Sequence, residues 1–416
     1  MIVSVIGLGY IGLPTAALLA SNGMHVIGVD VNESVVNTIN QGMIHIVEPG
    51  LSDFVKKSVS EGNLHATTVP EKADIFIVSV PTPFKEDFKP DISYIENAAK
   101  SISSILEKGN LVILESTSPV GTTEKMMDIM QKERPDLLFP KCGKDDSDID
   151  VYIAHCPERV MPGKVIQELV ENDRVVGGLT NTCSEKAKQM YKTFVKGECF
   201  TTDVRTAELC KLVENSYRDT NIAFANELSL ICDKLKIDVW KLIELANNHP
   251  RVNILQPGPG VGGHCIAVDP WFIVNSAPDE SKLISTARMI NDNRPNYVVS
   301  QIKNAARFTN LVNKKINIVC LGLSFKADID DLRESPAIKI VNSLNRLGFN
   351  KIYVVEPNIL QIPEHLNMES IELTSAEKGI AQSNIVVILV DHTEFKSIDK
   401  KLLTGKALVD TRGIFS

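Results

Sequence analysis

The sequence predicts an α/β protein with two doubly wound, Rossmann-like domains joined by a central region of long helices. Short β-branched runs alternate with helical stretches at both ends of the chain, which is typical of parallel sheets covered by helices. Between them, residues 206–235 and 281–308 have long helical patterns, and helices of this length need a partner surface to bury against. We therefore expect a first α/β domain over 1–203, a helical linking and dimerisation region over 204–310, and a second α/β domain over 311–416.

Composition narrows the class of protein. The chain has 416 residues, enough for two or three domains, and a net charge of −8 that argues against broad binding to nucleic acid or anionic membranes. Its eight cysteines include no CxxC pair, so we expect neither a metal site nor a disulfide framework. No apolar run reaches the ~18 residues of a membrane span, and a strand starting at the N-terminus leaves no room for a signal peptide. We expect a cytoplasmic protein.

The start of the chain carries a dinucleotide-binding fingerprint. A predicted strand at 2–6 runs into GLGYIG at 7–12, followed by a helical stretch at 13–21 and a second strand at 25–29 that ends on Asp30. This is the context of strand, tight turn, helix and second strand that the fingerprint requires. A glycine-rich turn that binds nothing is the alternative interpretation.

Each fingerprint residue has an expected task. Gly7 permits the turn, Gly9 lets a pyrophosphate approach the backbone, and Gly12 lets helix and strand pack closely. The pyrophosphate then lies at the positive end of the helix. Asp30 suits the ribose hydroxyls and would repel a 2′-phosphate, so the sequence favours NAD over NADP.

Two further predicted strands end in threonine-bearing loops. The run at 74–80 leads to Thr82, and the run at 111–114 leads to Thr117. Ligands of doubly wound sheets bind at the carboxyl ends of strands, so both threonines are expected to face the cofactor. The alternative is that each is a helix N-cap or an ordinary loop residue.

The stretch QPGPGVGGHCIAVDPW, residues 256–271, places four glycines ahead of Cys265 and Asp269 four residues beyond it. Glycines allow close approach of a ligand to the backbone, so Cys265 is a candidate nucleophile. A turn leading to a buried structural cysteine is an equally open alternative. A phosphate-binding P-loop is rejected, because His264 and Cys265 stand where that motif needs Lys and Ser or Thr.

The helical pattern that begins at Thr206 places Lys211, Asn215 and Asp219 on one face, at i, i+4 and i+8. A polar stripe on a long helix is usually a solvated face, and the pattern alone does not exclude that interpretation.

The last domain carries cations in its predicted loops: Lys326, Arg333 and Arg412. Its first turn lacks the full dinucleotide fingerprint, and cations at strand ends suit a phosphate or diphosphate. Surface salt bridges with neighbouring aspartates and Glu334 are the alternative.

Together these motifs resemble the UDP-glucose/GDP-mannose dehydrogenase family. The resemblance rests on GLGYIGLP, VPTPF, ESTSPVGT, CPERVMPG, AELCKLVENSYRDTNIAFANE, HPRVNILQPGPGVGGHCIAVDPW, GLSFKADIDDLRESPA and DTRG, which follow the family's order from end to end. It implies an enzyme that oxidises the primary alcohol of a UDP-sugar to a carboxylate with two NAD⁺ per turnover. The loop HPRVN, with His249 and Arg251, and His264 before the cysteine resemble members that oxidise UDP-N-acetyl-D-mannosamine for surface polysaccharide synthesis.

The resemblance also implies roles for single residues. Cys265 would form a thiohemiacetal and then a thioester, with Lys211, Asn215, Asp269 and Glu158 sharing the proton chemistry. The cofactor-binding positions would be Gly7, Gly9, Tyr10, Ile11, Gly12, Asp30, Thr82, Thr117 and Arg333. The substrate-binding positions would be Arg159, Val160, Lys211, Asn215, Arg218, His249, Arg251, Gly262, Phe325, Lys326 and Arg412.

The three regions take matching functions from the resemblance: NAD binding over 1–203, dimerisation and catalysis over 204–310, and UDP-sugar binding over 311–416. A homodimer with sites near the subunit interface is implied, because Arg333 matches a position that reaches the cofactor of a neighbouring subunit, and Arg251 is a second candidate to cross the dimer. The same chemistry on UDP-N-acetylglucosamine or UDP-glucose is an alternative. A two-electron hydroxyacid dehydrogenase would not need Cys265, and a non-catalytic NAD-sensing protein would not need the catalytic set.

Overall fold

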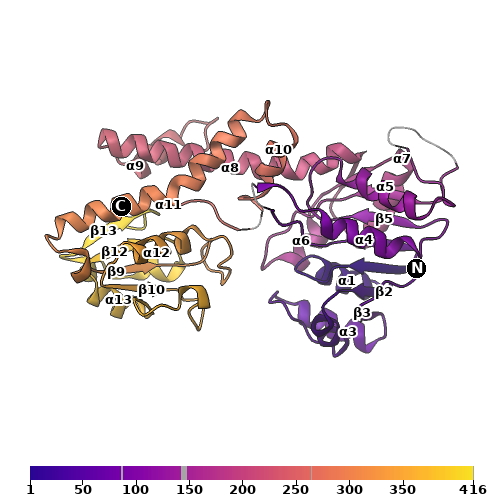
Figure 1. The fold of residues 1–416 in the computed structure, drawn as a ribbon, viewed down its shortest axis with the longest axis horizontal. Helices are drawn as coiled ribbons and strands as arrows, with labels where there is room; N and C mark the ends of the chain where they lie inside the picture. The colour runs from indigo at the N-terminus through magenta and orange to yellow at the C-terminus, as the bar shows by residue number, and fades with distance from the viewer. Residues whose placement is uncertain (86–87, 142–147, 264, 416) are drawn as a thin grey trace. The chain divides into compact units, whose positions relative to one another are not determined.

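The computed structural model describes residues 1–85, 88–141, 148–263 and 265–415 (Figure 1). Its chain forms two compact units, Met1–Glu214 and Asn215–Ser416. Cys142, most of the polar loop predicted over 141–150, and His264 lie outside the described residues.

The first unit is built on a sheet that has, in the described part of the chain, eight strands in the order β3-β2-β1-β4-β5-β6-β7-β8. The strands are β1 (Ile2–Ile6), β2 (His25–Val29), β3 (Leu64–Thr67), β4 (Ile75–Val78), β5 (Leu111–Leu114), β6 (Tyr152–His155), β7 (Arg174–Gly178) and β8 (Cys199–Asp203). All neighbours are parallel except β6 and β7, which are antiparallel. The doubly wound prediction is confirmed. The last two strands, β7 and β8, run opposite to the other six, which the sequence did not predict.

Helices cover both faces of this sheet. They are α1 (Gly12–Ser21), α2 (Glu33–Asn40), α3 (Leu51–Ser60), α4 (Ser93–Ser103), α5 (Thr122–Glu133), α6 (Val165–Glu171) and α7 (Asn181–Tyr191). Strand β5 shows the two faces, since Leu111 and Ile113 join the apolar cluster of α1, α3, α6 and α7. Val112 and Leu114 join the cluster of α4 and α5. The apolar run is continuous because both sides of the strand are buried.

Four helices follow along the chain: α8 (Val204–Leu235), α9 (Val239–Ala246), α10 (Asp269–Ser276) and α11 (Lys282–Phe308). The two long ones, α8 and α11, begin and end within about two residues of the predicted ranges. Asp238 starts α9 by accepting hydrogen bonds from the N–H groups of Trp240 and Lys241. Cys232 on α8 packs against Val239 and Ile243, which joins the end of α8 to α9.

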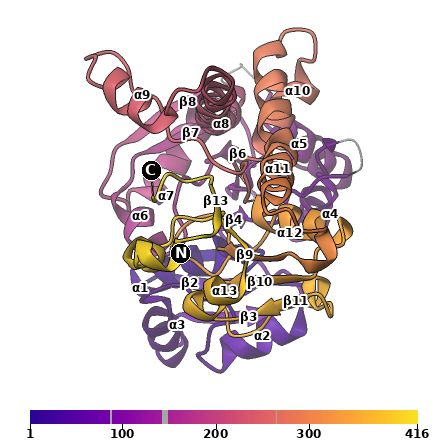
Figure 2. The same ribbon diagram turned by 90° about the vertical axis from the view of Figure 1, so that its left-hand side faces the viewer.

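The second unit contains a smaller sheet, whose described strands have the order β11-β10-β9-β12-β13 and are all parallel. The strands are β9 (Asn317–Leu321), β10 (Lys351–Val355), β11 (Ile371–Leu373), β12 (Ile385–Ile388) and β13 (Ala407–Asp410). The helices around this sheet are α12 (Pro336–Arg346) and α13 (Ala376–Gln382). Short 3₁₀ turns are η2 (Asn313–Lys315), η3 (Glu364–Leu366), η4 (Thr393–Ser397) and η5 (Lys400–Leu403). On β9, Ile318 and Cys320 face α11 and α12. Val319 and Leu321 face the other side, where they pack with α13. Figure 2 labels the strands and helices of this unit. This is the second doubly wound domain that the sequence predicts.

Within the described residues, none of the helices combines the length and the apolar character that a membrane crossing needs. The same residues hold no cluster of three or more His, Cys, Asp or Glu side chains arranged for a metal ion.

Candidate active site

The glycine turn after β1 has the shape of a dinucleotide cradle. Gly7 has a φ of +93°, and a Cβ there would lie 2.5 Å from the carbonyl oxygen of Ser79. A Cβ on Gly12 would lie 1.8 Å from the carbonyl oxygen of Gly7. A Cβ on Gly9 would meet nothing within 4 Å, so the backbone there is open to a ligand. Tyr10 is exposed beside it, and Ile11 directly precedes α1.

Asp30 stands at the end of β2, where its carboxylate also organises the turn. Oδ2 accepts a hydrogen bond from the Leu8 N–H at 3.0 Å, and Oδ1 accepts one from the Asn32 N–H at 2.9 Å. Each carboxylate oxygen has a further lone pair, so ribose hydroxyls can still donate to it. These residues fit NAD.

Thr82 and Thr117 lie together at the ends of β4 and β5. The Thr82 hydroxyl donates to the carbonyl oxygen of Thr117 at 2.6 Å. The N-cap positions of the following helices are Ile92 and Gly121, so the N-cap interpretation of the two threonines is wrong.

Glu158 lies in the loop after β6, and both of its carboxylate oxygens are held. Oε1 accepts from the Arg159 N–H at 2.8 Å, and Oε2 accepts from Arg174 Nη1 at 2.9 Å. The Arg159 guanidinium is itself paired with Glu214 at 2.7 Å. Val160 next to it is half-buried.

The polar stripe on α8 is buried. Lys211, Asn215 and Asp219 are 9%, 8% and 1% exposed, so the interpretation as a solvated helix face is wrong. Asp219 ties α8 to α11, because it accepts hydrogen bonds from Arg288 at 2.6 Å and Asn291 at 2.8 Å. Burial raises the pKa of Asp219 to about 6, although Arg288 opposes the shift.

In the second unit, Asn215 and Asp269 are hydrogen-bonded, with Asn215 Nδ2 donating to Asp269 Oδ2 at 2.6 Å. Asp269 is the buried first residue of α10, and its N–H donates to the Cys265 carbonyl oxygen at 2.8 Å. Cys265 itself is exposed. The interpretation of this residue as a buried structural cysteine is therefore wrong.

The loop that leads to Cys265 is fixed at Gly258. Its N–H donates to Asn226 Oδ1 at 2.9 Å, and its carbonyl oxygen accepts from Arg294 Nε at 2.9 Å. A Cβ on Gly258 would lie 2.8 Å from Arg412 Nη1. The missing side chain thus makes room for the guanidinium of Arg412.

The same loop packs on Phe325 from the last domain. A Cβ on Gly262 would lie 2.8 Å from Phe325 Cβ, and one on Gly263 would lie 3.0 Å from the ring. The Gly263 N–H also donates to the Arg333 carbonyl oxygen at 3.3 Å. The structure therefore brings Gly262, Phe325 and Arg412, three predicted substrate positions, to one loop.

The other predicted cationic side chains differ in their ion-pair partners and in their exposure. Arg333 forms a salt bridge with Asp331, with nitrogen–oxygen distances of 2.9 and 2.7 Å, which is the alternative that the sequence left open. Arg412 Nε lies 3.4 Å from Asp391, and Lys326 is exposed. Two further substrate candidates are neighbours in an exposed segment, where His249 Nδ1 accepts from the Arg251 N–H at 3.3 Å; Arg218 is exposed on α8.

The structure contains two buried polar clusters that the sequence did not predict. One joins Glu115, Arg174 and Tyr191 behind Glu158. In the other, Glu356 Oε2 lies 3.0 Å from His392 Nε2 and accepts from two N–H groups of the turn that leads to Phe325. A carboxylate directly after an apolar strand, as at Glu115, is the one sequence signal for the first cluster.

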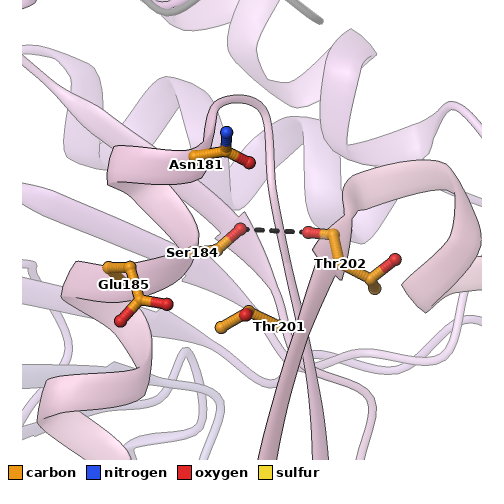
Figure 3. A pocket seen from close by; sticks show the side chains of 5 residues that line it. All are labelled: Asn181, Ser184, Glu185, Thr201 and Thr202. Carbon is orange, nitrogen blue, oxygen red and sulfur yellow. Dashed lines mark hydrogen bonds between the residues drawn. The ribbon is translucent and has the colours of Figure 1, made fainter.

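A small polar pocket lies at the start of α7 and the edge strand β8, and none of the residues that line it is a predicted site residue (Figure 3). It is lined by Asn181, Ser184, Glu185, Thr201 and Thr202. The only charged lining side chain is that of Glu185, which does not suit an anionic nucleotide.

Two nucleotide-type folds, a dinucleotide cradle and an exposed thiol on a glycine loop define an NAD-dependent dehydrogenase of nucleotide sugars. The chain belongs to the UDP-glucose/GDP-mannose dehydrogenase family, matching its NAD-binding domain over 1–195, its central domain over 205–293 and its UDP-binding domain over 319–416. This membership disfavours the NAD-sensing and hydroxyacid dehydrogenase alternatives.

The relatives are similar over nearly their whole length. A UDP-N-acetyl-D-mannosamine dehydrogenase from Campylobacter jejuni is 59% identical, covering 94% of this chain and 96% of the relative. An NDP-N-acetyl-D-galactosaminuronic acid dehydrogenase from Ralstonia nicotianae is 57% identical, covering 100% and 96%. The solved structure of a UDP-D-ManNAc dehydrogenase from Pyrococcus horikoshii is 37% identical, with a TM-score of 0.88 and coverage of 100% and 96%.

Proposed function

We propose that this enzyme oxidises UDP-N-acetyl-D-mannosamine to UDP-N-acetyl-D-mannosaminuronate in two NAD⁺-dependent steps through a thioester on Cys265. The observation that carries the proposal is the exposure of Cys265 on a glycine loop. The same loop packs against Phe325 and leaves room for the guanidinium of Arg412. A thiol in that position can hold an aldehyde covalently between two oxidations, which a two-electron dehydrogenase does not need.

A covalent bond to Cys265 links the two oxidations. Removal of a proton and a hydride from the C6 alcohol gives an aldehyde, whose carbon Cys265 Sγ attacks to form a thiohemiacetal. Loss of a second hydride and the hydroxyl proton gives the thioester, and water then breaks the carbon–sulfur bond and releases the acid. NAD⁺, when bound at the Gly7–Gly12 turn, accepts the hydride in each oxidation.

The proton chemistry is assigned to buried groups. Lys211 and Asn215 lie one helical turn apart on α8, where a cation and an amide donor stabilise the oxyanion that forms at the sugar carbon. Asp269 holds the Asn215 amide through its 2.6 Å hydrogen bond and assists the proton transfers of Lys211 or water. Glu158, whose carboxylate is held on both oxygens, activates the water that hydrolyses the thioester.

The three regions of the chain and the remaining site residues are assigned to binding the cofactor and the substrate. The NAD domain is assigned to 1–203, the catalytic and dimerisation region to 204–310, and the UDP-sugar domain to 311–416. Tyr10, Ile11, Thr82 and Thr117 surround the cofactor with the glycine turn and Asp30. The sugar nucleotide is held by Arg159, Val160, Arg218, His249, Arg251, Gly262, Phe325, Lys326 and Arg412, and Arg333 reaches the cofactor of a neighbouring subunit.

The sugar is assigned from the relatives and the HPRVN segment. UDP-N-acetyl-D-mannosamine is the first candidate, because a relative of that name is 59% identical. A second candidate is an N-acetylgalactosamine nucleotide, because a relative named for its uronic acid is 57% identical over the whole chain. UDP-N-acetylglucosamine and UDP-glucose remain comparison substrates.

The decisive experiment measures NADH formed per sugar consumed with a panel of these UDP-sugars. We expect about two NADH per UDP-N-acetyl-D-mannosamine and the highest kcat/KM for that sugar. A yield of one NADH would exclude the thioester route. A higher kcat/KM for the galacto-configured sugar would replace the sugar assignment and leave the chemistry intact.

We also propose a homodimer, formed through α8. Six large apolar side chains on this helix are exposed, at intervals of four, four, seven, seven and four residues: Leu209, Val213, Tyr217, Phe224, Ile231 and Leu235. A stripe at this spacing suits helix–helix packing with a second copy. Sedimentation should give a dimer, and Phe224→Asp should shift it toward monomer; a monomeric wild-type protein would exclude the assignment.

We place the enzyme in the cytoplasm, in surface polysaccharide synthesis. The seven described cysteines are all free, which suits a reducing compartment. The product is a uronic acid linked to UDP, and a glycosyltransferase is the class of enzyme that consumes such a sugar donor.

A further inference from the structure

A buried guanidinium lies directly behind Glu158 in the first unit. Arg174, the first residue of β7, is only 4% exposed. Its Nη1 lies 2.9 Å from Glu158 Oε2 and 4.0 Å from Oε1 of Glu115, the residue directly after β5. One cation is thus shared between the proposed hydrolytic base and a second carboxylate with no assigned role.

The position of Arg174 is fixed from several sides. Its Nη2 donates to the Leu169 carbonyl oxygen at 3.3 Å, and its guanidinium lies 4.6 Å from the centre of the Tyr191 ring and 5.6 Å from that of Phe194. The Tyr191 hydroxyl donates to Glu115 Oε1 at 2.8 Å. Tyr191 therefore contacts the guanidinium with its ring and the second carboxylate with its hydroxyl.

The charges in this cluster do not cancel when both carboxylates are ionised. Burial raises the pKa of Glu115 to about 7, with Arg174 opposing the shift and the charge of Glu158 adding to it. The Cys156 thiol, which also faces the cluster, has its pKa raised to about 12 by burial and stays neutral. Glu115 is therefore a second carboxylate whose charge competes with that of Glu158 for the Arg174 guanidinium, at 4.0 Å and 2.9 Å.

We propose that Glu115 and Tyr191 are positioning residues for Glu158, acting through Arg174. The inference rests on the proposed role of Glu158 in thioester hydrolysis. A base that activates water needs a fixed carboxylate direction, and small misplacements cost much of the rate. Thioester formation does not use Glu158, so a loosened cluster slows only the step in which water attacks the thioester.

The test uses Glu115→Gln and Tyr191→Phe in the full-length enzyme. Gln keeps the shape and the acceptor for Tyr191 while it removes the charge, and Phe keeps the ring while it removes the hydroxyl. We expect kcat to fall roughly tenfold with KM unchanged or lower, an undiminished burst of NADH, and a UDP-sugar adduct on Cys265 visible by intact-protein mass.

Glu208→Gln is the matched control. Glu208 is a fully buried carboxylate of the same unit that accepts from the Gly121 and Thr123 N–H groups at 2.6 and 2.8 Å. A general loss of packing would affect this variant as well, but it should not accumulate the adduct. Circular dichroism and NAD binding report folding, and if Tyr191→Phe does not fold, Glu115→Gln decides the question.

Glu158→Gln distinguishes a failure of the positioning inference from a failure of the proposed function. If it accumulates the adduct while Glu115→Gln does not, the positioning inference is overturned and the proposed function stands. If neither Glu158→Gln nor Glu115→Gln accumulates adduct while the wild type yields two NADH, the hydrolytic role of Glu158 fails and the inference fails with it. A wild-type yield of one NADH overturns the thioester route itself.

Discussion

The Asn215 amide donates to the Asp269 carboxylate at 2.6 Å, which joins α8 to the first residue of α10 inside the second unit. Both side chains are buried, so the amide is oriented by a partner that water cannot replace. The donor and acceptor roles make this pair sensitive to isosteric substitution.

Exchanging Asn215 for Asp should abolish turnover. Two buried carboxylates would then face each other at hydrogen-bond distance, and one would have to take up a proton or move away. We expect kcat to fall by roughly 100-fold or more while NAD⁺ affinity is retained. Steady-state kinetics and NAD⁺ titration measure the two effects. Kinetics like those of the wild type would mean that the amide has no part in the reaction.

Replacing Cys265 with Ser should stop complete turnover. The hydroxyl is a much poorer nucleophile than a thiolate, so no thioester forms and acid production should fall by roughly 1,000-fold or more. Folding and NAD⁺ binding should be intact because the side chain is exposed. Cys210→Ser, at a half-buried thiol on α8, is the matched control and should retain activity. Acid production at the wild-type rate by Cys265→Ser would make this thiol dispensable.

Gly258→Ala should weaken substrate binding without unfolding the protein. The added Cβ would lie 2.8 Å from Arg412 Nη1, the far end of a long side chain that can shift at little cost to folding. A displaced guanidinium loses a charge-assisted hydrogen bond of ~1.5–3 kcal/mol, so we expect the KM for the UDP-sugar to rise roughly tenfold or more. Gly262→Ala is the contrast, because its Cβ would meet the Glu334 carbonyl oxygen at 2.7 Å and should destabilise the fold. An unchanged KM for Gly258→Ala would remove Arg412 from the substrate site.

Asp30→Asn should relax the preference for NAD⁺ over NADP⁺. The amide keeps an acceptor for the Leu8 or Asn32 N–H and removes the charge that repels a 2′-phosphate. We expect weaker NAD⁺ binding by roughly 1 kcal/mol and measurable turnover with NADP⁺. The ratio of kcat/KM for the two cofactors is the measurement, and an unchanged ratio would show that discrimination lies elsewhere.

Glu356 should give the second sheet an acid-sensitive stability. Burial alone would raise the pKa of Glu356, but the hydrogen bond with His392 and those from the Leu323 and Ser324 N–H groups outweigh burial and lower it below 4.5. A lowered folded-state pKa contributes stability above the ordinary value, and this stability is lost as the pH falls through the folded-state pKa. Between about pH 6 and pH 3 the urea midpoint should fall more for the wild type than for Glu356→Gln. Parallel curves for the two proteins would contradict this.

Much of the fold was predictable because it depends on local patterns. The GLGYIG turn, the buried apolar strands and the two long helices each carry a periodic or compositional signal within a few residues. The direction of β7 had no such signal, since RVVGG reads the same in a parallel or an antiparallel pairing. Strand direction depends on the connection and on tertiary packing.

The site was predictable where a motif delivers the residue, as at Cys265 and Asp30. The spacing of Lys211, Asn215 and Asp219 gave their common face but not its burial, which depends on elements distant in the chain. Likewise, nothing local in the sequence pairs Arg174 with Glu158 or Arg294 with Gly258. Such partners are chosen by the tertiary fold.

The reversal of β7 has a chemical result. In the antiparallel pairing with β6, Ala154 faces Gly178 and His155 faces Gly177. Continuing that register one residue at a time past the end of β6 brings Glu158 opposite Arg174, the two residues whose side chains meet at 2.9 Å. If β7 were parallel to β6, its first residue would lie at the amino end of β6, far from Glu158. The counterion of the carboxylate is thus supplied by sheet topology, and a one-residue insertion in β7 would exchange it for a neighbour on the wrong face.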